Sequence, residues 1–352
     1  MLSITLEGPP FERGFQHGKQ FAQEIKEEIR IFCPDYWLQS LEVAELTKRL
    51  LSSIARDYPE LMIEMIGISK GSGISFDQIT LLNLIWQTAT KGLETDAAIP
   101  YTFKMACSAI GFSDSDFGPI IGKNCDDSQS AAPFYLFQKV YPEENLAFMG
   151  ISNVGTVWLE AGVNEAGFGF MQTAGQILQN QPGYGISCNI APRPMLARCR
   201  TADEGLLMLK NMYVAGRGMG IVLADFTGKV LAVEKAGNLY AISAVGPNPT
   251  FCTNHFVTPN MAATKPIALP GYEENTKTRY HTLELLLRGE SWVQSLEGMK
   301  RALGYHGEAG FVCQHGDINI YTNYSCIAVL RERKILLGDG YPCLNNYYEY
   351  RL

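Results

Sequence analysis

The hydrophobic pattern of this chain changes its period near residue 107, and that change limits the folds the chain can adopt. Before this point, apolar residues recur at intervals of three and four, as in helices with one buried face. The pattern there predicts the helices 11–32, 41–56, 58–69 and 77–91. After it, short apolar runs bounded by turn residues predict strands. The chain therefore begins as a helical segment and continues as a segment rich in strands.

The second segment alternates between groups of strands and groups of helices. Its predicted strands are 107–112, 119–122, 146–151, 156–163, 167–171, 219–225, 229–235, 318–321, 325–330 and 334–337, and its predicted helices are 193–213, 276–288 and 292–303. Helices, strands, helices and strands in this order are typical of an α+β protein in which helices cover sheets, rather than of alternating βαβ units. We find no repeat and no linker, so we expect one domain over residues 1–352. The stretch 258–275 is predicted to be a long surface loop.

Two local glycine patterns call for separate interpretations. Gly14 and Gly18 lie inside the first predicted helix, where glycine is unusual, and we expect them to let another backbone approach closely. The glycine-rich stretch 216–220 precedes a predicted strand and opens no helix. It therefore fails the context required of a dinucleotide-binding loop and is interpreted as a loop.

Composition excludes several classes of function. The net charge of −7 and the lack of a basic run argue against nucleic acid as a partner. No stretch is apolar enough to span a membrane, and the first residues do not form a signal peptide, so we expect a cytoplasmic protein. The nine cysteines include no C-x-x-C pair, and the five histidines show no ligand spacing. We therefore expect free thiols, no metal and no cofactor.

A predicted hairpin around residues 107–122 brings three reactive groups together. Cys107 begins the first strand, while Lys123 and Asp126 follow the second, which returns toward the start of the first. A thiol becomes a strong nucleophile only when it ionises, and a nearby cation or base promotes this. The alternative is that Cys107 is a buried apolar side chain, as most free cysteines are.

Two neighbouring residues further along the chain could assist such a thiol. His255 could act as the base of a Cys–His pair, although a structural histidine is the more common case. Asn254 could donate a hydrogen bond to an oxyanion, although asparagines in such positions are usually turn formers.

The motifs along the chain resemble one known family. They are Phe11 to Gly18, Cys107-Ser108, Gly122 to Asp126, Gly162 to Gly167, Leu223 to Gly228, Thr253 to Phe256, Thr322 to Ser325 and Gly340 to Cys343. In order and spacing they resemble the acyl-coenzyme A:6-aminopenicillanic acid acyltransferase family of N-terminal-nucleophile (Ntn) hydrolases. They are more distantly similar to choloylglycine hydrolases. The resemblance implies a four-layer αββα sandwich and self-cleavage between Ala106 and Cys107. The fragments 1–106 and 107–352 would remain associated.

The resemblance also implies roles for single residues. Cys107 would be the nucleophile, with its freed α-amino group as the base, and Asp126 would orient that amino group. Lys123 stands where choloylglycine hydrolases carry arginine, and it would stabilise the thiolate without arginine's paired donors. Asn254 would contribute to the oxyanion hole. Gln172 and Ser325 are further candidates for binding the substrate.

For the reaction, the resemblance implies hydrolysis or transfer of the acyl group of a small N-acyl amide, through a thioester on Cys107. An acyl-coenzyme A donor and a homo-oligomer are further expectations from the family. Two alternatives stay open. One is an uncleaved, inactive homologue that binds a small ligand. The other is a Cys107–His255 hydrolase that does not cleave itself, which replacement of His255 would distinguish.

Overall fold

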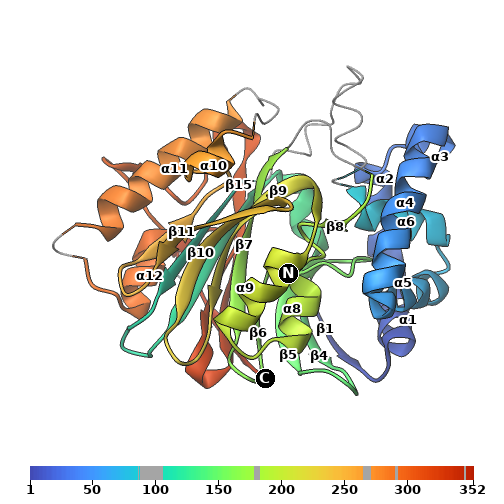
Figure 1. Cartoon of the computed structure of the whole chain (residues 1–352), viewed down its shortest axis with the longest axis horizontal. Helices are drawn as coiled ribbons and strands as arrows, with labels where there is room; N and C mark the ends of the chain where they lie inside the picture. The colour runs from blue at the N-terminus through green and yellow to red at the C-terminus, as the bar shows by residue number, and fades with distance from the viewer. Residues whose placement is uncertain (86, 88–105, 178–182, 265–270, 290–291, 345) are drawn as a thin grey trace.

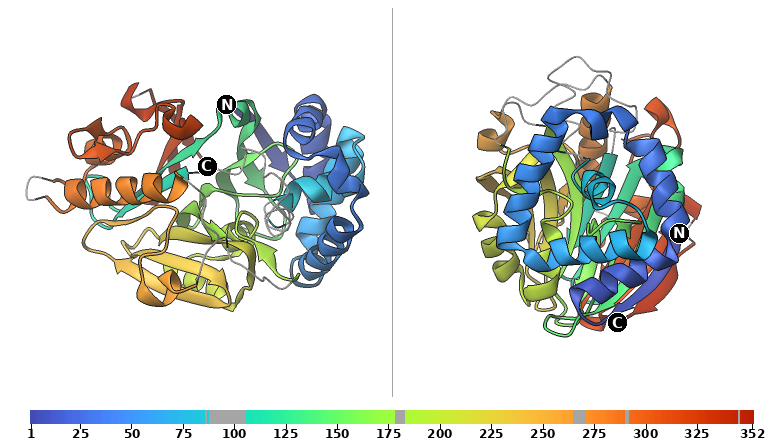
Figure 2. Two further views of the ribbon diagram at one scale, coloured as in Figure 1. Left: turned by 90° about the horizontal axis from the view of Figure 1, so that it is seen from above. Right: turned by 90° about the vertical axis from the view of Figure 1, so that its right-hand side faces the viewer.

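The computed structural model describes residues 1–352 except 86, 88–105, 178–182, 265–270, 290–291 and 345. Two β-sheets lie face to face at its centre, and helices cover the outer face of each (Figure 1). The N-terminal helices gather at one side of the sheets, and in the right view of Figure 2 they face the viewer. The predicted four-layer αββα sandwich is therefore confirmed.

The larger sheet has nine strands. Eight of them follow the order β1 (Leu2–Glu7), β4 (Tyr135–Tyr141), β5 (Phe148–Asn153), β6 (Ala161–Asn164), β7 (Gly169–Ile177), β9 (Val214–Ala224), β10 (Val230–Gly237) and β11 (Leu239–Val245), and β8 (Ile186–Ser187) also pairs with β9. The pairs β1–β4 and β8–β9 are parallel, and the other pairs are antiparallel. The first strand of the chain thus becomes an edge strand of a sheet built mainly by the second segment.

The smaller main sheet has six antiparallel strands and carries the predicted hairpin. Their order is β12 (Thr250–Cys252), β2 (Ala106–Phe112), β3 (Ile120–Asp127), β15 (Tyr321–Val329), β16 (Lys334–Asp339) and β17 (Tyr348–Arg351). Every residue of β2 and β3 is buried, because one face meets the larger sheet and the other meets helices. A short pair, β13 (His306–Gly307) and β14 (Gly310–Phe311), stands apart.

Four main helices complete the outer layers. Helices α11 (Tyr272–Leu287) and α12 (Leu296–Leu303) pack on the six-stranded sheet through a core that includes Leu283, Met299 and Phe112. Helices α8 (Pro192–Arg198) and α9 (Ala202–Asn211) pack on the nine-stranded sheet. The short α10 (Pro259–Ala262) contacts β10 and β11.

The N-terminal helices pack through glycines. They are α1 (Pro10–Gln20), α2 (Ala22–Phe32), α3 (Asp35–Gln39), α4 (Leu41–Asp57), α5 (Pro59–Ser72) and α6 (Phe76–Asn83). A Cβ atom on Gly14 would lie 2.0 Å from the carbonyl oxygen of Glu64, and one on Gly18 would lie 2.2 Å from that of Ile68. Both contacts join α1 to the backbone of α5, so the expected close approach is confirmed.

A buried ionic cluster ties these helices to the second segment. Glu64 on α5 accepts hydrogen bonds from Arg193 on α8, at 2.8 and 3.0 Å, and from Arg13 on α1, at 3.1 Å. All three side chains are almost completely buried. Beside them, the buried His17 accepts a hydrogen bond from the N–H of Gly155. Burial lowers the pKa of His17 to about 4, so this ring is neutral at pH 7.

Several sequence predictions of element boundaries need correction. Helix 11–32 is two helices, because α1 ends at Gln20, and helix 193–213 is likewise divided into α8 and α9. Strand 156–163 begins only at Ala161, and strand 318–321 is replaced by a short 3-10 turn before β15. The glycine-rich stretch 216–220 is part of β9 rather than a loop. Part of the predicted loop 258–275 is helical, and residues 88–91 of helix 77–91 lie outside the described residues.

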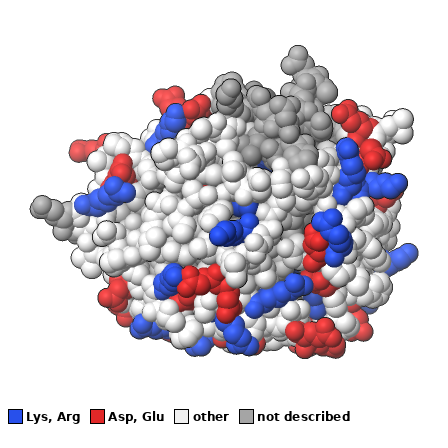
Figure 3. Space-filling model, in the orientation of Figure 1, with Lys and Arg blue, Asp and Glu red and all other residues white. Residues whose placement is uncertain are grey.

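No membrane span is found in what the structure describes, and the one face shown in Figure 3 carries charges of both signs. None of its described helices is both long and apolar enough to cross a bilayer. On the face shown in Figure 3, basic and acidic side chains alternate among the described residues, and neither sign forms a continuous surface.

Candidate active site

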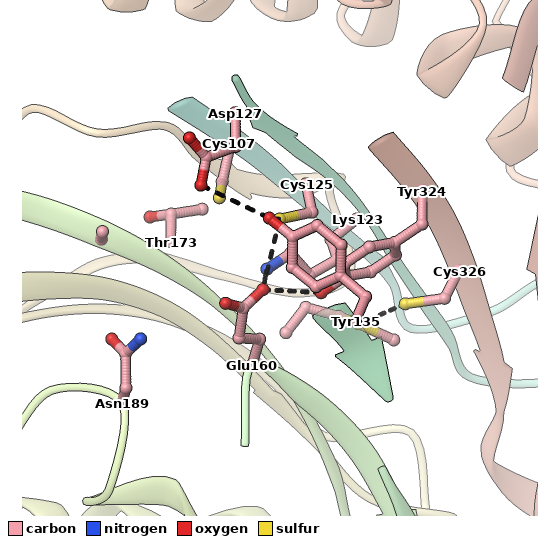
Figure 4. Close-up of polar contacts among 12 residues, drawn as sticks. Cys107, Lys123, Cys125, Asp127, Tyr135, Glu160, Thr173, Asn189, Tyr324 and Cys326 are labelled. Atoms are coloured by element: carbon pink, nitrogen blue, oxygen red, sulfur yellow. Dashed lines mark hydrogen bonds and ion pairs between the residues drawn. The ribbon is translucent and has the colours of Figure 1, made fainter. Parts of the chain in front are cut away.

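The hairpin β2–β3 places Cys107 opposite Cys125. The two residues are register partners, so their side chains lie on the same face of the sheet. Lys123, two residues before Cys125, shares that face. Figure 4 shows these three side chains pointing from the six-stranded sheet toward Thr173 on β7 of the other sheet. The thiol of Cys107 therefore lies in the space between the two sheets, where its residue is only 1% exposed.

Glu160 supplies the negative charge of this space. It lies just before β6 and is fully buried. Its Oε2 lies 3.3 Å from Lys123 Nζ, accepts from the hydroxyl of Tyr324 at 2.7 Å and lies 3.3 Å from Cys125 Sγ (Figure 4). The buried ammonium is thus held by a carboxylate from the opposite sheet, which fixes its position beside the two thiols.

The surroundings favour the ionised form of Cys107. The pKa of the Cys107 thiol is lowered to about 6, because a hydrogen bond with Cys125 and the charges of Lys123 and Arg279 together outweigh burial and the charge of Glu160. Burial and the same hydrogen bond raise the pKa of Cys125. Burial lowers the pKa of the Lys123 ammonium, but the negative charges of Cys107 and Glu160 raise it by more, so its pKa is raised overall. At neutral pH the site therefore holds one thiolate, on Cys107, beside a cation.

Asn254 contacts the backbone of the nucleophile rather than its sulfur. Its Oδ1 accepts a hydrogen bond from the N–H of Cys107 at 2.8 Å, and its Nδ2 donates to the carbonyl of Ala174 at 2.7 Å. The N–H of Asn254 in turn donates to Thr276 Oγ1 on α11 at 2.8 Å. The amide group is therefore anchored, and among the described residues its Nδ2 uses one of its two hydrogens.

Arg279 on α11 organises the same backbone from the outer face of the sheet. Its Nη1 donates to the carbonyl of Cys107 and to Ser108 Oγ, the latter at 3.1 Å. Its Nη2 donates to Asn254 Oδ1 at 2.8 Å, and its Nε to Asn275 Oδ1 at 2.9 Å. The side chain is fully buried. One guanidinium thus holds both the nucleophile's carbonyl and the asparagine that contacts its N–H.

Asp126 lies on the outer face, below the backbone at the start of β2. It is the register partner of Ala106, and its Oδ1 accepts from Thr322 Oγ1 at 2.6 Å. Its Oδ2 has no hydrogen-bond partner among the described residues. Burial raises the pKa of Asp126 to about 7, while Arg279 acts in the opposite direction. The carboxyl group is thus close to the Ala106–Cys107 junction but does not share the face of the thiol.

The structure does not bring Gln172 and Ser325 to the thiol. Met171 contacts Cys326 across the sheets, and the neighbouring residues in each strand must point the other way. Ser325 accordingly contacts Tyr347 and the carbonyl of Lys123 on the outer face. The period of a strand therefore turns both side chains away from the thiol, and substrate binding by Gln172 and Ser325 stays a prediction.

His255 is turned toward α11 and does not contact the thiol. Its Nδ1 lies 3.2 Å from Thr253 Oγ1 and 3.1 Å from Thr276 Oγ1, and its ring packs edge-on against Tyr280. Burial lowers the pKa of His255 to about 4, with further lowering by Arg279. This arrangement gives no support to a Cys107–His255 pair.

Sequence reasoning missed Glu160 and Arg279. Glu160 follows an apolar run within a predicted strand, and a carboxylate in such a run was the available signal. Arg279 lies in a polar stretch of α11 that looks solvent-exposed, so nothing in its neighbourhood marks it as buried. Cys125 lies within the motif from Gly122 to Asp126, but sequence reasoning assigned no role to it.

Comparison with solved structures shows distant similarity to three amide hydrolases. The first is a mutant of the conjugated bile acid hydrolase from Clostridium perfringens, with 12% identity, a TM-score of 0.46, and coverage of 70% of this chain and 92% of the other. The second is the Caenorhabditis elegans orthologue of N-acylethanolamine-hydrolyzing acid amidase, with 12% identity, a TM-score of 0.42, and coverage of 64% and 93%. The third is penicillin V acylase from Agrobacterium tumefaciens, with 12% identity, a TM-score of 0.38, and coverage of 66% and 83%. No curated protein matches the sequence.

A family match gives the firmer assignment. The model of the acyl-coenzyme A:6-aminopenicillanic acid acyl-transferase family matches residues 113–299, just over half of the chain. This range includes Lys123, Asp126, Glu160, Asn254 and Arg279, and it begins shortly after the nucleophile candidate. The chain therefore belongs to the acyl-coenzyme A:6-aminopenicillanic acid acyl-transferase family.

Proposed function

We propose that this chain is a self-processing cysteine amidohydrolase or acyltransferase that acts on a small N-acyl amide through a thioester on Cys107. The observation that carries the proposal is the lowered pKa of the Cys107 thiol, about 6. This thiol lies beside the buried ammonium of Lys123. A thiolate at neutral pH is the nucleophile that acyl transfer requires. The family assignment supports the same class of chemistry.

The first reaction is the cleavage of the chain itself. The sulfur of Cys107 attacks the carbonyl carbon of Ala106, and the C–N bond breaks as the nitrogen takes up a proton. The resulting thioester is opened by water, which leaves a carboxylate on Ala106 and a free thiol and amine on Cys107. Arg279 supports this step, because it holds the carbonyl of Cys107 and so limits movement of the residue.

The second reaction uses the new α-amino group as a base. A free α-amine has a pKa of about 7.7–8.0, which suits proton transfer near neutral pH. Asn254 Oδ1, which accepts from the N–H of Cys107, would accept from the amine in the same place. Asp126 would orient the amine from the outer face, and the remaining hydrogen of Asn254 Nδ2 would stabilise the oxyanion.

The acyl group then leaves the sulfur in one of two ways. Water gives hydrolysis, and an amine acceptor gives transfer. Because the name of the family includes acyl-coenzyme A, an acyl-coenzyme A thioester is a second candidate donor. Assays with an N-acyl amide alone, and with an acyl-coenzyme A plus an amine, separate the two activities.

After cleavage, the fragments 1–106 and 107–352 would stay together. The nine-stranded sheet incorporates β1 from the first fragment beside β4 from the second. The Glu64 cluster joins α5 of the first fragment to α8 of the second through buried charged hydrogen bonds. Separating the fragments would expose these charges without their partners, which is unfavourable.

The intact mass of the denatured protein tests the proposal. We expect two species whose masses sum to 39.0 kDa plus one water, with Cys107 as a new N-terminus. Cys107→Ala should stay uncut and inactive toward N-acyl amides. Cys199→Ala is the matched control, because Cys199 is a buried free cysteine on the far side of the nine-stranded sheet and should leave cleavage unchanged.

Two outcomes would contradict the proposal. A single species at 39.0 kDa in the wild type would favour the uncleaved alternative. Amide hydrolysis at the wild-type rate by Cys107→Ala would show that another group is the nucleophile.

A further inference from the structure

A second group of reactive side chains converges at the surface, away from Cys107. It consists of His306, Cys313, His315 and Cys343. His315 Nε2 lies 3.3 Å from Cys313 Sγ and 3.5 Å from Cys343 Sγ. The ligand atoms of His306, His315 and Cys343 all lie within 4.8 Å of one another, and Cys313 also forms a hydrogen bond with Cys343. Three potential ligands thus surround one point, and the thiol of Cys313 adjoins two of them.

These side chains come from three separate parts of the chain. His306 begins β13, Cys313 and His315 follow β14, and Cys343 lies in the 3-10 turn Pro342–Leu344 after β16. The spacing matches no short ligand motif, which is why the sequence predicted no metal. The fold brings the C-terminal turn against the 306–315 segment.

Two separations within this group fit the edge length of a tetrahedral zinc site. Zinc binds cysteine sulfur at about 2.3 Å and histidine nitrogen at about 2.0 Å, so two such ligands lie about 3.5 Å apart. The two measured separations from His315 Nε2 agree with that edge length. Two thiolates and two imidazoles form a ligand set typical of structural zinc sites.

An ion can reach this point from solvent. A hollow of about 550 Å³ is lined by His306, Gly307, Gly310, Phe311, Cys313 and His315. Both histidines are exposed and Cys343 is half-buried, whereas Cys313 is buried at the base. The ring of His315 stacks on Tyr341 at a centroid distance of 4.3 Å, which orients its Nε2 toward the thiols.

We propose that His306, Cys313, His315 and Cys343 bind one zinc ion. The ion would cross-link the 306–315 segment to the C-terminal turn. It would form a structural site, because all four positions would be taken by protein ligands and none would remain for a substrate or water.

The proposed zinc site has a direct structural connection to the candidate active site. Gln314, which lies between two of the ligands, donates its N–H to Thr322 Oγ1 at 2.8 Å, and Thr322 donates to Asp126. The side chain of Gln314 also contacts Asn275, which accepts from Arg279. The ion would therefore hold the segment that supports both Asp126 and Arg279.

Metal analysis of the purified full chain tests this inference. We expect about one zinc per chain in the wild type, and equally in Cys107→Ala, since the site does not depend on the proposed cleavage. After chelation, reloading with Co²⁺ should produce the visible bands of a tetrahedral thiolate complex. His306→Ala and Cys343→Ser should each reduce bound zinc by about tenfold or more.

His281→Ala removes an exposed histidine on α11, which carries none of the proposed ligands, and should keep the full zinc content. His306 is exposed, so its variant should fold even where Cys343→Ser does not. Zinc below a tenth of an equivalent after incubation with Zn²⁺ would overturn the inference. So would zinc content unaffected by His306→Ala, or a Cys313–Cys343 disulfide, detected by mass, in the protein as purified.

Discussion

Lys123 Nζ lies 3.3 Å from Glu160 Oε2, and the exposed fractions of the two side chains are 0% and 1%. The ammonium comes from the six-stranded sheet and the carboxylate from the nine-stranded sheet, so the ion pair crosses the interface that holds the Cys107 thiol. A buried charge that loses its partner is strongly destabilising, whereas loss of both charges is much less so.

Lys123→Met should therefore destabilise the protein by about 3–5 kcal/mol, because it leaves Glu160 charged and buried. The double variant Lys123→Met/Glu160→Gln should recover a large part of this loss. Chemical denaturation of the two single variants and the double variant measures the coupling between them. Lys123→Arg is the control that keeps the charge. Additive losses would show that the two groups do not interact.

Alkylation of Cys107 should depend on pH with a midpoint near 6, because only the thiolate reacts. The rate of iodoacetamide modification, followed by peptide mass, should level off above about pH 7. Cys125→Ser replaces the sulfur that forms the strongest stabilising hydrogen bond, and Lys123→Met removes a cation, so both variants should move the midpoint upward. A wild-type midpoint near 8.5, that of an ordinary thiol, would contradict the described electrostatics.

Asp126→Asn should make stability less dependent on pH. Burial raises the pKa of Asp126 from 3.8 to about 7. The stability that this group contributes is therefore fully present below pH 3.8 and is lost as pH rises through 7. The asparagine variant can still accept from Thr322 but has no proton to lose. As pH rises from 4 to 8, the free energy of unfolding should therefore fall by up to about 4 kcal/mol less in Asp126→Asn than in wild type.

Urea denaturation across this pH range measures the effect. Asp114→Asn is the matched control, because it replaces an exposed carboxylate on the β2–β3 connection and should change stability little. A pH dependence that is the same in Asp126→Asn and wild type would show that Asp126 is ionised in the folded protein throughout.

Arg279→Lys should slow self-cleavage by about tenfold or more while keeping a positive charge. Lysine cannot reproduce the paired donors to the Cys107 carbonyl and Asn254, so both groups lose their orientation. The rate at which the precursor mass disappears reports the effect. Lys277→Ala, an exposed position on the same helix, should cleave at the wild-type rate. Equal rates for Arg279→Lys and wild type would refute the positioning role.

Gly18→Ala should destabilise the protein by about 3 kcal/mol, although alanine normally favours a helix over glycine by about 1 kcal/mol. The added methyl group would lie 2.2 Å from the carbonyl oxygen of Ile68, so α1 and α5 would have to separate. Lys19→Ala, at the next and exposed position, should change stability little. A thermal unfolding temperature that rises in Gly18→Ala would contradict the close contact.

The period of the hydrophobic pattern located most elements correctly but not their ends. Helix 11–32 divides near Phe21, where the tertiary structure turns the chain. Strand 156–163 failed at its start, because residues 156–160 are buried as irregular structure that carries Glu160 to the thiol. Strands such as β4 and β11 went unrecognised. Pairing with neighbouring strands of the nine-stranded sheet, rather than local propensity, makes them strands.

The sequence by itself determined the helical and strand-rich segments, the glycine contact of α1 and the hairpin that carries Cys107, Lys123 and Asp126. These follow from local periodicity and from the short distance between the two strands. Only the tertiary structure decided which groups surround the thiol. Glu160 arrives from the segment before β6 and contacts Lys123 and Cys125, and Arg279 arrives from a helix far away in sequence and holds the backbone of Cys107. Strand alternation turns Gln172 and Ser325 away from the thiol. The reason is physical: local patterns report which side of an element is buried, whereas the partner across a packed interface depends on how distant elements stack.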